Sequence, residues 1–250
     1  MRKFGLIGKF LDHSWSNEYF HQKFIREKIN NCVYENFPLG DLNGLRKLVL
    51  DDSELSGLNI TIPYKLEILQ YLDELDPAAE AIQAVNCMQI SRRGSSVHLK
   101  GFNTDMVAFQ ESLKPLLLET HRKALVLGTG GSSRAVCHAL KELDMEYSIV
   151  SRQKQKGALT YADLNEQIIS GHQIIINATP VGMYPNEDQC LPMPYHYLTS
   201  QHLLYDLIYN PEETLFLKKG RETGAQVKNG LEMLHLQAEL SWEIWNEHFL

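Results

Sequence analysis

The sequence predicts an α/β protein in two parts, and three observations support this prediction. Its 250 residues, 44% of them hydrophobic, fit one large domain or two modest ones. Beyond about residue 104, short apolar runs alternate with helical segments, which is typical of a parallel sheet covered by helices on both faces. The preceding residues lack this regular alternation, so the organisation of the chain changes near that point.

Residues before 104 predict strands joined by short helices. We expect strands over 3–8, 32–37 and 58–62, helices over 18–29, 42–50 and 66–75, and a hairpin formed by 84–90 and 96–101. In the third strand Leu58, Ile60 and Ile62 fall at every second position. Asn59 and Thr61 therefore share the opposite face. Pro63 then stops strand pairing, and leucines spaced near the helical period follow it.

Residues after 104 predict the regular α/β pattern. We expect helices over 105–118, 132–142, 160–170 and 211–222, strands over 123–127, 147–151, 173–178, 203–208 and 225–228, and a last helix over 230–247. The strands are short apolar runs, as buried parallel strands are.

Composition excludes several classes of function. A formal net charge of −7 argues against broad binding to nucleic acid or anionic membranes. The sequence contains no run of 18 apolar residues, so it predicts no membrane span. Lys9 interrupts the first apolar run too early for a signal peptide. The four cysteines lie far apart and the ten histidines form no zinc-type motif, so we expect reduced thiols and no metal.

A glycine-rich loop lies between an expected strand and an expected helix. It contains Gly128, Gly130, Gly131 and Ser132. Glycines permit a tight turn and a close approach of backbone N–H groups to phosphate, and the helix N-terminus adds partial positive charge. Ser133 stands where the dinucleotide-binding fingerprint usually has glycine or alanine, and it still permits close packing. We interpret the loop as a dinucleotide site, and a plain strand-to-helix turn is the alternative.

The end of the next strand indicates which dinucleotide. An NAD site has an acidic residue there, which accepts from the ribose 2′-OH. This strand ends at Ser151 and Arg152, with Lys154 nearby. A guanidinium suits a 2′-phosphate, so we infer NADP. A solvated basic turn is the alternative.

Lys65 and Asp105 are candidates for proton transfer. Lys65 follows the strand that carries Asn59 and Thr61, and Asp105 begins an expected helix. A lysine beside a carboxylate can polarise a carbonyl and supply the proton that hydride addition requires. Alternatively, Lys65 is a surface charge and Asp105 only favours the helix N-terminus.

These residues together resemble the shikimate dehydrogenase family along nearly the whole chain. The matching segments are His13-Ser14-Trp15-Ser16, Asn59 to Lys65 (NITIPYK), Ala84-Val85-Asn86, Gly101 to Asp105 (GFNTD), Asn177 to Met183 (NATPVGM), Asp206-x-x-Tyr209-x-Pro211 and Asn229 to Ala238. Three departures stand out: Asn17 replaces a usual Pro, Trp15 a frequent Lys, and Ser151-Arg152-Gln153 the family's Asn-Arg-Thr. The last departure predicts a softer preference for NADP.

The resemblance implies a substrate-binding α/β domain over 1–104, a Rossmann-like NADP domain over 105–229, and a C-terminal helix over 230–250 that packs on the substrate domain. It implies that Lys65 and Asp105 are catalytic. The implied substrate-binding residues are Ser14, Ser16, Asn59, Thr61, Asn86, Tyr209 and Gln237. The implied cofactor-binding residues are Gly128, Gly130, Gly131, Ser132, Ser151, Arg152, Thr179, Gly182, Met183 and Gly230.

The resemblance implies NADP-dependent, reversible reduction of 3-dehydroshikimate to shikimate, in aromatic amino-acid biosynthesis. We expect a cytoplasmic monomer or homodimer that binds neither nucleic acid nor membrane. A quinate/shikimate dehydrogenase with relaxed substrate or cofactor use is one alternative. A non-catalytic NADP sensor on the same scaffold is the other.

Overall fold

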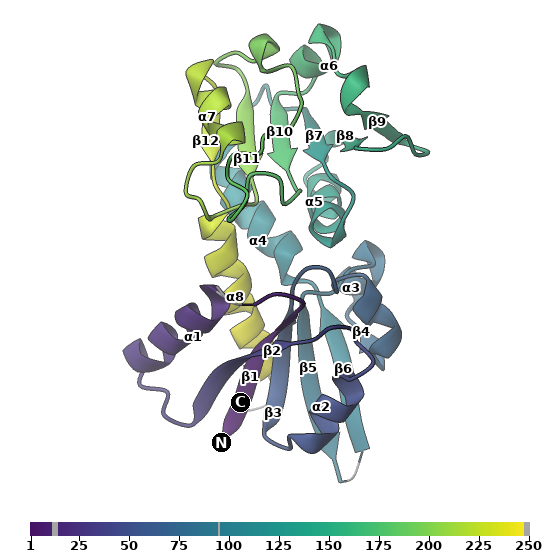
Figure 1. Ribbon diagram of the computed structural model, residues 1–250, viewed down its shortest axis with the longest axis vertical. Helices are drawn as coiled ribbons and strands as arrows, with labels where there is room; N and C mark the ends of the chain where they lie inside the picture. Colours follow the sequence, from purple (N-terminus) through teal and green to yellow (C-terminus); the bar gives the residue numbers. More distant parts are fainter. Residues whose placement is uncertain (12–14, 95, 248–250) are drawn as a thin grey trace. The chain divides into compact units, whose positions relative to one another are not determined.

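The computed structural model describes residues 1–11, 15–94 and 96–247. The chain divides into two compact units (Figure 1). Unit 1 comprises Met1–Thr104 and Ala238–Leu250, and unit 2 comprises Asp105–Gln237. The second division therefore falls inside the last helix, whereas the sequence analysis placed it after residue 229.

Unit 1 contains a mixed sheet, sheet A. Its strands are β1 (Arg2–Gly8), β2 (Cys32–Pro38), β3 (Leu55–Ile60), β4 (Glu74–Leu75), β5 (Cys87–Arg93) and β6 (Ser96–Phe102). Its helices are α1 (Trp15–Arg26), α2 (Leu45–Asp51), the 3-10 helix η1 (Glu67–Tyr71) and α3 (Pro77–Ile82), with the end of α8 (Leu231–Asn246). The strand order is β2-β1-β3-β5-β6-β4; β1 runs parallel to β2 and β3, and β5 antiparallel to β3 and β6.

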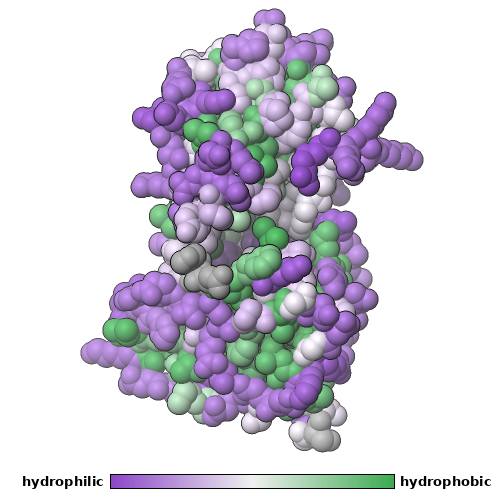
Figure 2. Space-filling view, viewed as in Figure 1, coloured by the Kyte–Doolittle hydropathy of each residue, from purple (hydrophilic) through white to green (hydrophobic). Residues whose placement is uncertain are grey.

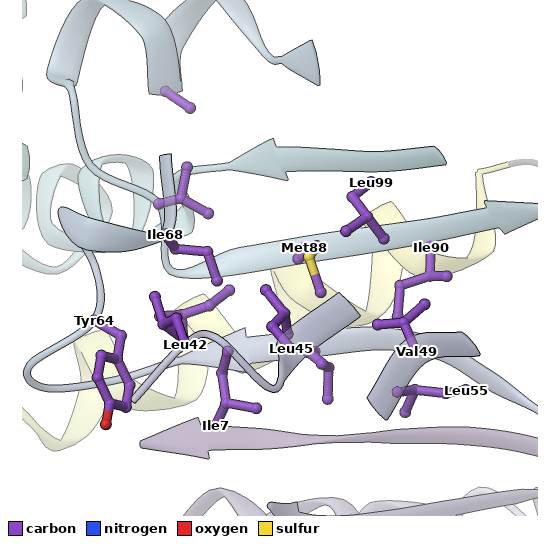
Figure 3. Close-up of a cluster of buried hydrophobic side chains, with 14 residues drawn as sticks. Ile7, Leu42, Leu45, Val49, Leu55, Tyr64, Ile68, Met88, Ile90 and Leu99 are labelled. Carbon is purple, nitrogen blue, oxygen red and sulfur yellow. The ribbon is translucent and has the colours of Figure 1, made fainter. Parts of the chain in front are cut away.

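Successive residues of sheet A point to opposite faces, as the strand pleat requires. One face packs against α2 and η1, and Figure 3 shows Val49 of α2 in one cluster with Leu55 and Ile90 of the sheet. The other face packs against α1 and the end of α8, where Phe4 stacks on Trp245 with ring centroids 4.7 Å apart. Sheet A thus lies between two helical layers.

Unit 2 contains a wholly parallel sheet, sheet B. Its strands are β7 (Lys123–Leu127), β8 (Glu146–Ser151), β9 (Ala158–Thr160), β10 (Ile174–Asn177), β11 (Leu203–Asp206) and β12 (Gln226–Lys228), in the order β12-β11-β10-β7-β8-β9. Its helices are α5 (Gly131–Glu142), α6 (Glu166–Gly171), α7 (Leu215–Glu222) and nearly all of α4 (Thr104–Leu113), with the 3-10 helices η2 (Lys114–Leu116), η3 (Tyr161–Asp163) and η4 (Tyr195–Tyr197).

Both faces of sheet B are buried, as the short apolar strands predict. Leu125 and Leu204 join a cluster that includes Phe216 of α7. Tyr205 points to the other face, where its ring meets Phe109 of α4 and its hydroxyl lies 2.7 Å from Ser112 Oγ. The predicted parallel sheet covered by helices is therefore confirmed.

The predicted helix over 66–75 is wrong. The chain forms a short 3-10 helix, η1, and then strand β4. Leucines three residues apart match the 3-10 repeat better than the α-helical repeat. The Asp73 carboxylate also accepts from Leu99 N at 2.8 Å, which draws the chain onto the edge of sheet A. Helix α3, which Asp76 caps and Pro77 begins, was not predicted.

Other elements differ from prediction at their boundaries. The segment 160–170 is not one helix, because a capping box at Thr160 and an N-cap at Asn165 produce two short helices. Helix α1 begins at Trp15 rather than residue 18, which places Ser16 in its first turn. Helix α4 ends at Leu113, and α7 begins at Leu215, after Thr214 caps it.

On the face drawn in Figure 2, hydrophilic residues surround smaller apolar areas. Over residues 1–11, 15–94 and 96–247, no helix has both the length and the apolar character needed to cross a bilayer. All four cysteines are free thiols, as predicted.

Candidate active site

The parallel strands of sheet B meet at one carboxyl edge, and the strand order reverses there. From β7 the chain continues outward through β8 and β9; it then returns to β10 and continues outward through β11 and β12. Ligands of open α/β sheets bind outside the carboxyl ends of strands at such a reversal point. The glycine loop after β7 lies at this point.

The glycine loop has a conformation that requires glycine. Gly128 has a φ of +119°, and a Cβ on it would lie 2.9 Å from the Ala178 carbonyl oxygen, after β10. Gly130 precedes α5, and a Cβ there would meet nothing within 4 Å. Among the described residues no side chain caps the start of α5. The helix N-terminus therefore fits a phosphate group.

The end of β8 has the basic residue expected for NADP. Ser151 ends the strand, and its Oγ accepts from the Gln153 N–H at 3.3 Å. Arg152 is exposed, and no carboxylate in the described part of the chain forms an ion pair with it. The acidic residue that would bind an NAD ribose and repel a 2′-phosphate is absent at this position.

The loop after β10 is held by Asn177 and Asp206. Asn177 Oδ1 accepts from Thr179 N and Oγ1 at 3.0 and 2.7 Å. Asn177 Nδ2 donates to Asp206 Oδ1 at 3.0 Å. Asp206 also accepts from Ile208 N at 3.0 Å and from Thr214 Oγ1 at 2.6 Å. Complete burial raises the pKa of Asp206 to about 7, although all three donors favour the carboxylate.

Four further predicted residues lie beside this loop or after the last strands. Met183 is partly exposed and Gly182 has a φ of +91°, another conformation that favours glycine. Tyr209 follows β11, and burial raises its pKa. A Cβ on Gly230 would lie 2.1 Å from the Leu207 carbonyl oxygen, so that position requires glycine.

In unit 1, the backbone around Lys65 is anchored on both sides. Tyr64 is buried, and its hydroxyl donates to the Leu39 carbonyl oxygen at 2.6 Å. The Lys65 carbonyl oxygen accepts from Val85 N at 2.8 Å, which places Lys65 next to the Ala84-Val85-Asn86 segment. Thr61 is half-buried between β3 and this turn.

Three of the predicted substrate residues are deeply buried in unit 1. Asn59 Oδ1 accepts from the Tyr34 hydroxyl at 2.9 Å, and its Nδ2 donates to Ser241 Oγ at 2.8 Å. Asn86 Nδ2 donates to Thr104 Oγ1, and Asn86 Oδ1 accepts from Thr104 N, at the start of α4. Ser16 is buried beside the Tyr34 hydroxyl. The structure brings these three residues into one polar cluster.

The remaining predicted residues fall in different places. Asp105, the residue after Thr104, is buried in the first turn of α4. Gln237 lies on α8, and its Nε2 donates to the Leu234 carbonyl oxygen at 3.0 Å. By the division above, Asp105 and Gln237 belong to unit 2 and Lys65 to unit 1. Ser14 lies outside the described residues.

Sequence reasoning assigned no role to Tyr34, Ser241 or Asp206. Tyr34 occupies an apolar position of an alternating strand, where a hydroxyl gives no signal. Ser241 lies four residues after Gln237, and that helical spacing is a signal that was available. Asp206 is the last residue of strand β11 (Leu203–Asp206), so the sequence also indicates its position at the carboxyl edge.

The chain resembles known proteins along nearly its whole length. A model of the shikimate dehydrogenase substrate binding domain matches residues 6–88. A shikimate dehydrogenase (NADP(+)) from Methanococcus aeolicus is 37% identical, over 96% of this chain and 90% of the relative. The structure of shikimate 5-dehydrogenase from Thermus thermophilus in complex with NADP(H) and shikimate has a TM-score of 0.83 at 30% identity, covering 99% of this chain and 94% of that one.

A solved structure with a different substrate name is also similar. Quinate dehydrogenase from Corynebacterium glutamicum in complex with NAD has a TM-score of 0.84 at 25% identity, covering 98% of this chain and 94% of that one. The identity to the curated relative is higher and extends over most of both chains. The glycine loop, the anchored lysine turn and these likenesses agree: the chain belongs to the shikimate dehydrogenase family.

Proposed function

We propose that this chain is an NADP-dependent shikimate dehydrogenase, which reversibly reduces 3-dehydroshikimate to shikimate in aromatic amino-acid biosynthesis. One observation carries the proposal. A dinucleotide loop at the reversal point of sheet B is followed by Arg152 instead of an acidic residue, in a chain of this family. NADP, when bound, supplies or accepts the hydride.

The cofactor fits the carboxyl edge of sheet B. Gly128, Gly130, Gly131 and Ser132 form the turn into α5 that would hold the diphosphate. Ser151 and Arg152 would hold the 2′-phosphate through charge-assisted hydrogen bonds. The remaining residues that we assign to cofactor binding are Thr179, Gly182, Met183 and Gly230.

Lys65 and Asp105 would handle the proton. The Lys65 ammonium can donate to the oxygen of the reacting carbonyl as hydride arrives and can stabilise the negative charge that develops there. The anchored backbone on both sides of Lys65 limits its freedom, which supports this role. Asp105 would hold the Lys65 ammonium in place and accept a hydrogen bond from a ring hydroxyl of the substrate.

Polar side chains would recognise the substrate's carboxylate and ring hydroxyls. We assign this binding to Ser14, Ser16, Asn59, Thr61, Asn86, Tyr209 and Gln237. A site of this kind discriminates strongly, because an analogue that lacks one hydroxyl leaves buried groups without partners.

The wider assignment follows from the family and the free cysteines. We propose a cytoplasmic location, since four free thiols suit a reducing compartment. We also propose a monomer or homodimer, which sedimentation of the purified chain distinguishes.

The test is NADPH formation by purified chain supplied with shikimate and NADP, followed by absorbance. The Lys65→Ala variant is the negative control, because it removes the proposed proton donor and leaves the glycine loop intact. Turnover by the wild type alone supports the proposal. A folded wild type without turnover contradicts it and favours a non-catalytic sensor.

The second candidate is a quinate/shikimate dehydrogenase with relaxed specificity. It is favoured by the likeness to the quinate dehydrogenase structure and by Ser151 and Gln153, which replace the family's Asn and Thr. Comparable turnover with quinate, or with NAD, would favour it over the first.

A further inference from the structure

A buried polar network lies between sheet A and α8. It comprises Ser16, Tyr34, Asn59, Asn86, Thr104 and Ser241, each at most 8% exposed. Three of these are residues to which we assign substrate binding. The other three, Tyr34, Thr104 and Ser241, have no assigned role.

One half of the network runs from α1 to α8. The Tyr34 hydroxyl donates its proton to Asn59 Oδ1 at 2.9 Å, and Ser16 lies beside this hydroxyl. Asn59 Nδ2 donates to Ser241 Oγ at 2.8 Å. Both ends of the Asn59 amide are therefore engaged by protein groups, and Asn59 links Tyr34 to α8.

The other half runs from α8 to the start of α4. Ser241 Oγ lies 3.5 Å from Thr104 Oγ1. Thr104 Oγ1 accepts from Asn86 Nδ2 at 2.8 Å, and Thr104 N donates to Asn86 Oδ1 at 2.7 Å. The Asn86 carbonyl oxygen accepts from Asn59 Nδ2 at 3.4 Å and from Ile60 N at 2.8 Å. The two halves thus form one connected set.

The network fixes the two points where the chain leaves unit 1. Thr104 immediately precedes Asp105, and Ser241 lies one helical turn after Gln237. A buried polar group that loses its partner incurs its full desolvation cost, so each member constrains the orientation of the next. The hydroxyls of Tyr34 and Ser241 are therefore placed to set the orientation of Ser16, Asn86 and the start of α4.

We infer that Tyr34 and Ser241 are positioning residues for the shikimate half of the active site, because they hold the amide of Asn59, to which we assign substrate binding. This inference rests on the proposed function. It assigns to the network the orientation of groups that bind the substrate, and no part in binding NADP.

The experiment compares Tyr34→Phe and Ser241→Ala with Ser112→Ala in the full chain. Ser112 is the matched control, because it is equally buried and its hydroxyl bonds to a tyrosine, Tyr205, on unit 2. We measure kcat/KM for shikimate, KM for NADP, and the unfolding midpoint. The double variant Tyr34→Phe/Ser241→Ala tests whether the two hydroxyls act as a unit.

We expect each network variant to lower kcat/KM for shikimate about five- to tenfold, with KM for NADP unchanged. The double variant should lose less than the product of the single losses. Ser112→Ala should lower the unfolding midpoint comparably without lowering kcat/KM. Equal losses of kcat/KM in all three single variants would overturn this inference but not the proposed function. So would unchanged kcat/KM in the network variants of an active protein. A folded wild type that does not oxidise shikimate overturns the proposed function as well.

Discussion

Asp206→Asn should stabilise the protein at neutral pH, because burial of the Asp206 carboxylate opposes folding. Asp206 Oδ1 accepts from Ile208 N and Asn177 Nδ2, and its Oδ2 accepts from Thr214 Oγ1. An asparagine here can place its oxygen where Asp206 Oδ1 lies, and its nitrogen can donate to a rotated Thr214 hydroxyl. The substitution therefore removes the charge and retains all three hydrogen bonds.

The pKa of Asp206 sets the size and sign of the effect. It rises from 3.8 in the unfolded chain to about 7 in the folded protein, which corresponds to about 4 kcal/mol at roughly 1.4 kcal/mol per pKa unit. Between these values the folded protein keeps a proton that the unfolded chain has released. Stability from this group is thus present below pH 3.8 and is lost as pH rises through about 7.

The assay is chemical unfolding of wild type and Asp206→Asn at a series of pH values. The other titrating groups cancel in the difference between the two proteins. The advantage of the variant should grow by about 2–3 kcal/mol between about pH 5 and about pH 8. A difference that stays constant with pH, or one that shrinks as pH rises, would refute the reasoning about the buried carboxyl.

Three further predictions concern the proposed active site. Gly128→Ala should destabilise the folded state by about 1–3 kcal/mol, because its φ of +119° and the nearby Ala178 carbonyl oxygen disfavour a Cβ; Gly130→Ala should change thermal stability by less than about 0.5 kcal/mol, since space is open there. Arg152→Ala should raise KM for NADP at least about tenfold and leave KM for NAD unchanged; equal effects on both would remove Arg152 from 2′-phosphate binding. Lys65→Ala should lower kcat by about 10²- to 10⁴-fold with unchanged NADP affinity by titration, and wild-type turnover would exclude it from proton transfer.

The second half of the fold was readable because its signals are local. Short apolar runs such as residues 124–127 are wholly buried, so their composition alone predicts parallel strands. The glycine loop was readable for the same reason, since Gly128 needs a backbone conformation that other residues rarely adopt. Asn59 was also predicted to lie on the face opposite Leu58 and Ile60, and it does.

The rest depended on contacts between segments far apart in the sequence. Nothing local shows that the strand over Glu74–Leu75 pairs with β6, and the leucine spacing of this segment by itself predicts a helix. Nothing near Asn59 shows that its amide meets Tyr34 and Ser241, which lie 25 and 182 residues away. Polar side chains of one type can bind a ligand or one another, and only the three-dimensional arrangement separates these uses.

The most direct test of the central claim is reduction of 3-dehydroshikimate by the purified chain, measured as kcat/KM with NADPH and with NADH. Oxidation of shikimate and of quinate by NADP is measured beside it. We expect efficient reduction with NADPH, a clear preference over NADH, and oxidation of shikimate but not of quinate. Equal use of NADH, or faster turnover of quinate, would contradict the account.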